Sequence, residues 1–313
     1  MSFSTEVKQE LASLKHPNAC DKAELSGLFH IGGSIEIVDR HMRLLFQTTN
    51  KAVARKIMRL VNNVFSVEMD IISKKQLKLS KHDMYILKID DKVDEILDVL
   101  SLADKNATFF KDVDETLIED DTCKRAYLRG VFLAGGSINN PSTATYHLEI
   151  QAFSEKQAEI IAGLMNAFNL HAKTAKNKRG TIAYLKEAER IADFLRVIGA
   201  TNSLFSFEDS RIKRDFKNSI NRVINCDIAN ERKALAAAKR QLKDIRIIEK
   251  HPHLSLTKSD REAIFLRKHH PDASLHELSV LSEDHFDKRI SKSALNHRFR
   301  KLKEIADKVR RHD

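Results

Sequence analysis

One eleven-residue pattern occurs twice in this chain, and the repetition constrains the fold more than any other feature. It reads LSGLFHIGGSI at residues 25–35 and LRGVFLAGGSI at residues 128–138, so the copies start 103 residues apart. A glycine inside a helix costs about 1 kcal/mol relative to alanine. Gly27 and Gly130 therefore indicate two helices that approach each other closely through their backbones. The Gly-Gly pair that follows is typical of a helix C-terminus closed by a left-handed residue.

The segments that follow the two copies also share a pattern of apolar alternation and helical periodicity. After the first copy we predict strands at 34–38 and 42–48, a helix at 51–65, strands at 67–74 and 84–90, and a helix at 94–102. After the second copy we predict a strand at 146–153, a helix at 155–168, strands at 171–176 and 181–185, and a helix at 188–198. The fold class is therefore α+β, with a duplicated αββαββα domain whose two repeats are related by a pseudo-twofold axis.

The repeated motif resembles the LAGLIDADG element of homing endonucleases, in which two such helices pack side by side. Gly27 and Gly130 match the third letter, whereas the metal-binding acid at the eighth letter is replaced by Gly32 and Gly135. A glycine offers no side-chain oxygen to a divalent cation, which phosphodiester cleavage in that family requires. We therefore expect no catalytic residue, no metal site, no cofactor and no enzymatic activity. A metal-dependent endonuclease is the less favoured alternative.

Positive charge is concentrated in the last third of the chain. The formal net charge of the 313 residues is +10, yet residues 1–210 contain 28 Lys and Arg against 29 Asp and Glu. Residues 211–313 contain 26 against 15. Such asymmetry indicates an acidic polymer as partner of the C-terminal part, most often nucleic acid.

Changes in pattern along the chain divide it into six segments. These are an N-terminal helix at 1–20 capped by Ser4 or Thr5, a first repeat at 21–104, an acidic connector at 105–121, a second repeat at 122–210, a linker at 211–253 with a helix from about 231 to 249, and a helix-turn-helix domain at 254–313. No apolar run approaches the ~20 residues of a membrane span. Cys20, Cys123 and Cys226 are widely spaced and odd in number. This pattern favours unpaired cysteines in a reducing cytoplasm.

The last segment reads as three helices, at 260–268, 275–281 and from 291 to about 310. Thr257 or Ser259 caps the first, Ser274 caps the second in a capping box with Glu277, and Ser291 caps the third. Residues 282–289 form the intervening turn, and the helix-turn-helix spans Ser274 to Ile305. Its final helix is basic, with small polar residues at its start, as in helices that enter the major groove.

We predict the DNA contacts from this final helix. Lys292 and Arg300 suit guanine edges or phosphates, Asn296 suits adenine, and Arg298 suits the phosphate backbone. The full candidate set is Ser291, Lys292, Ser293, Asn296, His297, Arg298, Arg300 and Lys301. A charged helical bundle that serves only in dimerisation or docking is the alternative.

Two longer motifs, NRVINCDIAN at 221–230 and SKSALNHRFRKL at 291–302, resemble the WhiA family, and the order of the parts is similar over the whole chain. The resemblance implies a bacterial protein with a degenerate LAGLIDADG scaffold and a helix-turn-helix similar to the −35-binding region of sigma factors. It further implies transcription regulation in sporulation, or a role in cell division and chromosome segregation. We expect double-stranded DNA as partner, a possible protein partner on the duplicated domain, no membrane, and a cytoplasmic location at the nucleoid. A cell-division scaffold with incidental DNA binding is the rival.

Overall fold

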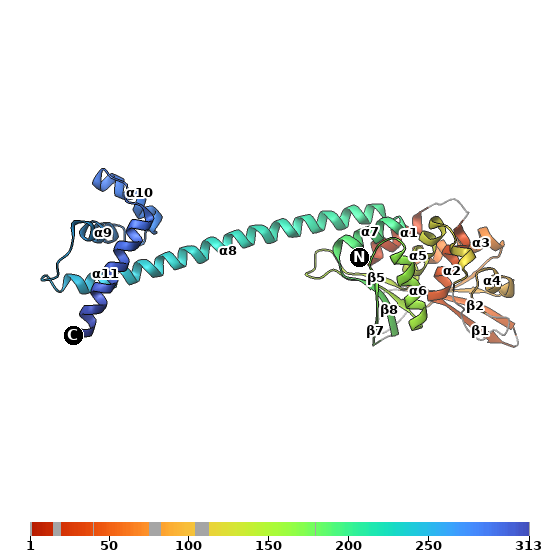
Figure 1. Ribbon diagram of the computed structural model, residues 1–313. Coiled ribbons are helices and arrows are strands. Elements are labelled where there is room, and N and C mark those ends of the chain that lie inside the picture. Colours follow the sequence, from red (N-terminus) through yellow and green to blue (C-terminus); the bar gives the residue numbers. More distant parts are fainter. Residues whose placement is uncertain are drawn as a thin grey trace. The chain divides into compact units, whose positions relative to one another are not determined.

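The computed structural model describes residues 2–14, 20–39, 41–74, 83–103, 113–178 and 180–312. The chain divides into two compact units, Met1–Arg214 and Asp215–Asp313. The first, hereafter the N-terminal unit, combines helices with two sheets, and the second, the C-terminal unit, is entirely helical (Figure 1). This division matches the expected α+β domain followed by an all-α domain.

Two consecutive αββαββα repeats make up most of the N-terminal unit. The first consists of α2 (Asp21–Gly32), β1 (Gly33–Val38), β2 (His41–Thr48), α3 (Lys51–Phe65), β3 (Asp70–Lys74), β4 (Met84–Ile89) and α4 (Val93–Val99). The second consists of α5 (Asp121–Gly135), β5 (Gly136–Ile138), β6 (Leu148–Ala152), α6 (Glu155–Asn166), β7 (Lys173–Asn177), β8 (Gly180–Leu185) and α7 (Ala188–Ile198). The antiparallel sheets have equivalent strand orders, β1-β2-β4-β3 and β5-β6-β8-β7. The duplication predicted from the sequence is confirmed.

Helices α2 and α5 pack against each other through their backbones at the two predicted glycines. A Cβ atom on Gly27 would overlap the carbonyl oxygen of Tyr127, and one on Gly130 would overlap the carbonyl oxygen of Glu24. Tyr127 and Glu24 are themselves 103 residues apart, so the two contacts are the same contact seen from each repeat. Reciprocal contacts of this kind are those of a twofold interface. The close approach predicted for Gly27 and Gly130 is therefore confirmed.

The Gly-Gly pairs end the helices differently from the expectation. Gly33 has φ −82° and ψ 154°, and Gly136 has φ −76° and ψ 146°, so both are extended and neither is left-handed. The left-handed cap was wrong because the chain passes directly from helix to strand at these residues. The glycines are needed for space instead, since a Cβ on Gly33 would crowd Phe29 and one on Gly136 would overlap the Phe132 ring.

A buried ion cluster links the two repeats beside the glycine contact. The Glu24 Oε1 atom lies 2.7 Å from Lys56 Nζ and 3.2 Å from Arg129 Nε. All three side chains are buried. Lys56 also donates to the carbonyl of Leu11, and Arg129 donates to the carbonyl of Ile198. The cluster thus joins α2 and α3 of the first repeat to α5 of the second, and ties both to α1 (Phe3–Ser13) and α7.

The segments before and between the repeats are short in the described residues. Ser2 caps α1 by accepting the N–H of Thr5 at 3.2 Å, so the cap precedes the predicted Ser4 or Thr5. In the connector, a single 3-10 turn, η2 (Glu115–Ile118), is described, and Ile118 packs partly against the core. Residues 105–112 lie outside the described residues.

Helix α8 (Thr201–Glu249) extends over 49 residues, beginning in the N-terminal unit and ending in the C-terminal unit. The predicted helix began thirty residues too late, at about 231. The stretch before that point contains asparagines at 218, 221, 225 and 230, which have low helix propensity. It also carries large apolar side chains that are exposed, namely Phe216, Ile220, Val223, Ile224 and Ile228.

The C-terminal unit packs three helices on the last turns of α8. These are α9 (Lys258–His269), α10 (Leu275–Phe286) and α11 (Lys292–His312). Their common core consists of Ile245, Ile248, Ala263, Leu266, Leu278, Ile290, Leu295, Phe299, Leu302 and Ala306. The end of α8 therefore belongs to the core of this unit. No helix in the described part of the chain is both long and apolar enough to span a membrane.

Candidate nucleic-acid interface

Side-chain caps fix where the helices of the C-terminal unit begin. Thr257 and Asp260 form a capping box at the start of α9, and Ser274 and Glu277 form another at the start of α10. The Ser291 hydroxyl accepts the N–H of Ala294 at 3.2 Å at the start of α11. The three predicted caps are confirmed, with Thr257 rather than Ser259 at the first.

The turn between α10 and α11 is shorter than predicted, because α10 continues to Phe286 and α11 begins at Lys292. Asp287 reverses the chain in the left-handed conformation, with φ 49°. The hydroxyl of Ser282 donates to the Ser279 carbonyl at 2.8 Å and accepts the Ile290 N–H at 2.7 Å. The turn assigned to 282–289 was therefore wrong at its start. Ser282, predicted as the first residue of the turn, is instead fully buried in α10 and bonds to the turn that follows.

One face of α11 is buried, and six of the eight predicted DNA-contact residues are exposed outside that face. At 100° per residue, Lys292, Asn296 and Arg300 span only 80° around the helix. The buried face carries Leu295, Phe299, Leu302 and Ala306. The exposed members of the candidate set are Ser291, Lys292, Ser293, Asn296, His297 and Arg300. The structure thus presents these six side chains to solvent from the first half of α11.

Two members of the candidate set, Arg298 and Lys301, instead contact α9. Arg298 Nη1 lies 3.1 Å from Glu262 Oε2, and Lys301 Nζ lies 2.7 Å from Asp260 Oδ2. Burial alone would raise the pKa of Asp260, but hydrogen bonds from Lys301 and Thr257 outweigh it and hold that pKa below its ordinary value. Lys301 keeps 42% of its side-chain surface exposed while its ammonium group contacts the acidic first turn of α9.

A buried arginine that the sequence reading did not single out orients α9 within the unit. The Arg267 Nε atom donates to Gln241 Oε1 of α8 at 2.9 Å. Its Nη1 donates to the carbonyls of His270 and Ala273, just after α9. Burial lowers the pKa of Arg267. A basic residue in the last turn of a helix, close to its free carbonyls, is the sequence signal that could have identified it.

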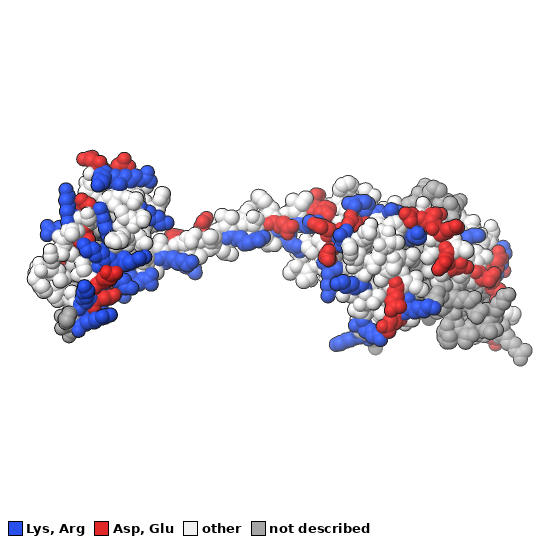
Figure 2. All heavy atoms as spheres, viewed as in Figure 1, with Lys and Arg blue, Asp and Glu red and all other residues white. Residues whose placement is uncertain are grey.

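Charge on the C-terminal unit is compatible with DNA. Figure 2 shows Lys and Arg side chains gathered over this unit, with acidic side chains between some of them. Among the acidic residues of this unit, Glu262 pairs with Arg298 and Asp260 pairs with Lys301. The basic and amide groups at the start of α11 are offset from those ion pairs, so they remain free to meet phosphates and base edges.

The positions equivalent to the nuclease acids, Gly32 and Gly135, lie at the C-terminal ends of α2 and α5. A Cβ atom on Gly32 would fall within the Phe46 ring, and one on Gly135 would meet the Cγ2 atom of Ile31. A Cβ on Gly135 would also lie 3.2 Å from the Gln151 carbonyl oxygen, so a side chain at either position would require its neighbours to move. Within the described ranges, a single group of three potential metal ligands occurs, and it lies at the opposite, N-terminal ends of the two helices.

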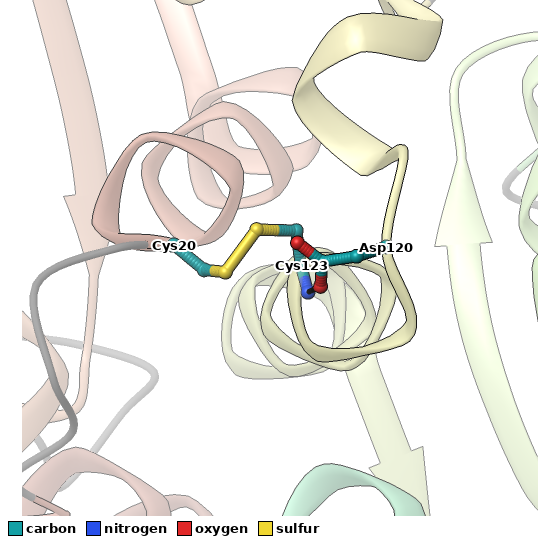
Figure 3. A group of neighbouring side chains, drawn as sticks. All are labelled: Cys20, Asp120 and Cys123. Carbon is teal, nitrogen blue, oxygen red and sulfur yellow. Dashed lines mark hydrogen bonds between the residues drawn. A yellow bond between two sulfur atoms is a disulfide. The ribbon is translucent and has the colours of Figure 1, made fainter.

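That group consists of Cys20, Asp120 and Cys123, and its two cysteines form a disulfide (Figure 3). The expectation of unpaired cysteines was wrong for this pair and stands for Cys226, whose thiol is free and exposed. The sequence separation of the bonded cysteines is 103, the same as the repeat offset. Equivalent residues near a twofold axis face each other, so this coincidence was the signal available in the sequence.

Comparisons with known proteins follow the same division of the chain. The family model described as the WhiA N-terminal LAGLIDADG-like domain matches residues 18–103, that of the WhiA LAGLIDADG-like domain matches 124–217, and that of the WhiA C-terminal HTH domain matches 220–306. Proteins named probable cell division protein WhiA from Macrococcus caseolyticus and Bacillus cytotoxicus are each 43% identical over 311 residues. The matches cover 99% of this chain and 97% and 98% of theirs.

Solved structures with the same architecture were also found. Full-length DUF199/WhiA from Thermatoga maritima superposes with a TM-score of 0.58 at 23% identity, covering 98% of this chain and 99% of that one. The N-terminal LAGLIDADG domain of DUF199/WhiA gives a TM-score of 0.50 at 24% identity, covering 63% and 90%. At these identities the likeness concerns the fold.

Proposed function

This chain belongs to the WhiA family, and from that premise we propose that it is a non-enzymatic DNA-binding protein of the transcription-regulator type. The relatives' name, probable cell division protein, supports a role in cell division. We extend the proposal to chromosome segregation, with a kinship to sporulation regulators, and to a cytoplasmic protein located at the nucleoid.

The exposed face of α11 is the observation that carries the proposal. Lys292 and Arg300 offer donors for guanine edges or phosphates, and the Asn296 amide can donate to N7 of adenine and accept from its N6 amino group. Ser291, at the helix N-terminus, and Ser293 suit phosphates or base edges. Arg298 and Lys301 contribute differently, because their ion pairs with α9 hold the recognition helix in position.

We propose no catalytic activity because the C-terminal ends of α2 and α5 carry glycines in place of metal-binding acids. Gly32 and Gly135 carry no side-chain ligand, and a side chain at these positions would collide with Phe46 and Ile31. Two-metal phosphodiester chemistry needs carboxylates that hold cations between the attacking and leaving oxygens. The duplicated domain would instead act as a rigid platform for a partner protein or for a second contact with DNA.

The proposal is tested with the full chain on DNA fragments recovered by mapping its bound sites on the chromosome. The triple variant Lys292→Ala, Asn296→Ala, Arg300→Ala should lose sequence-specific binding. A double variant of two exposed α8 residues in the same unit, Lys239→Ala and Arg240→Ala, removes the same number of charges and should keep the preference. Equal loss of preference in both variants would reduce the effect to net charge and contradict groove reading by α11.

The same variants separate the proposal from its rivals. If cells carrying the triple variant divide normally, DNA binding is incidental and the scaffold alternative gains support. Magnesium-dependent cleavage of any recovered fragment by the full chain would revive the endonuclease alternative. Location is followed with a fluorescent fusion, which should overlap the nucleoid for the unmodified chain and leave it for the triple variant.

A further inference from the structure

The disulfide joins the two repeats where their central helices begin. Cys20 is the residue just before α2 and is buried, and Cys123 lies in the first turn of α5 and is half-buried. The bond crosses the pseudo-twofold seam, with Asp120 beside it on the chain leading into α5 (Figure 3). The glycine contact and the buried ion cluster at Glu24 lie further along the helices than this bond.

The surroundings of the two sulfur atoms favour reversible chemistry. Each sulfur lies at a helix N-terminus, where the helix dipole stabilises a thiolate. Asp120 acts in the opposite direction, because its carboxylate and the two sulfur atoms all lie within 4.8 Å of one another. Its Oδ1 atom accepts the Cys123 N–H at 2.8 Å, so the same carboxylate caps α5. The reduced pair would therefore be reactive but held back by one removable negative charge.

We propose that Cys20 and Cys123 form a thiol–disulfide exchange site that reacts with low-molecular-weight thiols and disulfides and thereby switches a covalent bond between the two repeats on and off. In reduction, a thiolate of the small molecule attacks the more accessible Cys123 sulfur, and Cys20 leaves as a thiolate at the N-terminus of α2. A second small thiolate then attacks the small-molecule sulfur of the mixed disulfide and releases Cys123. The protein pair gains two electrons and two protons, and two small thiols become one disulfide.

Oxidation of the pair changes the connection between the repeats and leaves their fold in place. The bond closes a loop with a sequence separation of 103 residues. A cross-link of that length acts mainly on the unfolded chain, whose freedom it restricts. The reduced form keeps the glycine contact of α2 with α5, so the repeats stay paired but can separate at their entrance. The site thus couples the redox state of small thiols to the stability of the duplicated domain.

Thiol counting on the native full chain tests the proposal, because Cys226 supplies an internal reference. With a metal chelator present throughout, the chain is equilibrated in buffers of glutathione and glutathione disulfide at different ratios. The exchange is then quenched with acid, the chain is unfolded, and all free thiols are alkylated and assigned by peptide mass spectrometry. We expect one alkylated cysteine, Cys226, at the oxidising end and all three at the reducing end, with the Cys20–Cys123 peptide pair recovered from the oxidised sample. The variant Cys226→Ser should shift both counts down by one and leave the midpoint unchanged.

Two results would overturn the proposal. Three alkylated cysteines at every ratio would show that the bond does not form, and one alkylated cysteine in excess reductant, with the chain still folded, would show a permanent structural bridge. The variant Asp120→Asn tests the chemistry of the site, because asparagine keeps the helix cap and removes the charge. Its disulfide should be reduced several-fold faster and at a lower glutathione ratio, and an unchanged midpoint would overturn the assigned role of the carboxylate.

Discussion

Replacing Gly130 by alanine tests the backbone contact between α2 and α5, because helix propensity and steric overlap change the free energy of unfolding in opposite directions. Alanine stabilises a helix interior by about 1 kcal/mol relative to glycine. Here, however, the new Cβ would overlap the Glu24 carbonyl oxygen and lie 2.9 Å from the Leu28 nitrogen. Both are backbone atoms, so no rotamer change can relieve the clash, and the helices must separate. Overpacking of a core costs about 1–3 kcal/mol and occasionally more, so we expect Gly130→Ala to lower the free energy of unfolding by about 1–3 kcal/mol, in which the clash outweighs the helix propensity.

The measurement can be confined to the domain in question. The chain has no tryptophan and four tyrosines, Tyr85, Tyr127, Tyr146 and Tyr184, which all lie in the N-terminal unit. Tyrosine fluorescence during urea unfolding of the full chain therefore reports that unit. Gly163→Ala in α6 is the matched control, because nothing lies within 4 Å of a Cβ there, and it should stabilise by about 0.5–1 kcal/mol. If Gly130→Ala proves as stable as the unmodified chain or more so, the backbone contact is not the reason for the glycine.

Three further changes have signs fixed by buried or paired charges. Glu24→Gln leaves two buried cations without their anion, so urea unfolding of the N-terminal unit should show a loss of about 3–5 kcal/mol, whereas Glu36→Gln on the exposed β1 strand should be neutral. Burial lowers the pKa of Lys8 from 10.5 to about 8. Between pH 8 and pH 10.5 the unfolded chain therefore binds more protons than the folded chain, so the free energy of unfolding should rise with pH over this range. Lys8→Met should abolish that rise and stabilise the unit at pH 7. The pKa of Asp260 is held below its ordinary value, so the stability that this carboxylate contributes is complete above the ordinary pKa and is lost as pH falls through the lowered pKa. Lys301→Ala should weaken this loss of stability in acid, followed by circular dichroism at 222 nm. An unchanged pH profile would show that the ion pair contributes nothing.

The parts of the fold that the sequence predicted are those where local pattern and tertiary contact agree. The helix at 51–65 and the helix at 188–198 were predicted to the residue, because each has a clear amphipathic period and a clear end. The pairing of α2 with α5 was predictable because a glycine destabilises a helix interior, and close packing of two helix backbones compensates for that cost. Capping boxes at Thr257 and Ser274 were predictable because they involve only residues three apart.

Errors arose where a tertiary contact overrides local preference. Ser282 reads as a turn residue but is buried and bonded to the turn that follows it. The ion pair of Lys301 with Asp260 could not be predicted, because it depends on how α9 packs against α11. The asparagine-rich stretch at 218–230 of α8 has low helix propensity, and the predicted helix began only after it. The Cys20–Cys123 pair was not predicted, because the cysteine spacing was compared with the spacing in small disulfide-rich proteins. The informative comparison is with the offset of 103 residues between the two repeats.

The structure also separates two roles that a paired-helix motif combines. Gly27 and Gly130 are required by backbone contact, and this requirement holds whatever stands at the helix ends. The helix ends are a different matter, because Gly32 faces Phe46 and Gly135 faces Ile31, where a nuclease of this fold would place its acids. A chain can therefore keep the close helix pair, and with it the positions of both sheets, without a carboxylate at either helix end. Recognition of DNA can then rest on a separate element, and the exposed half of α11 supplies the polar and cationic groups for it.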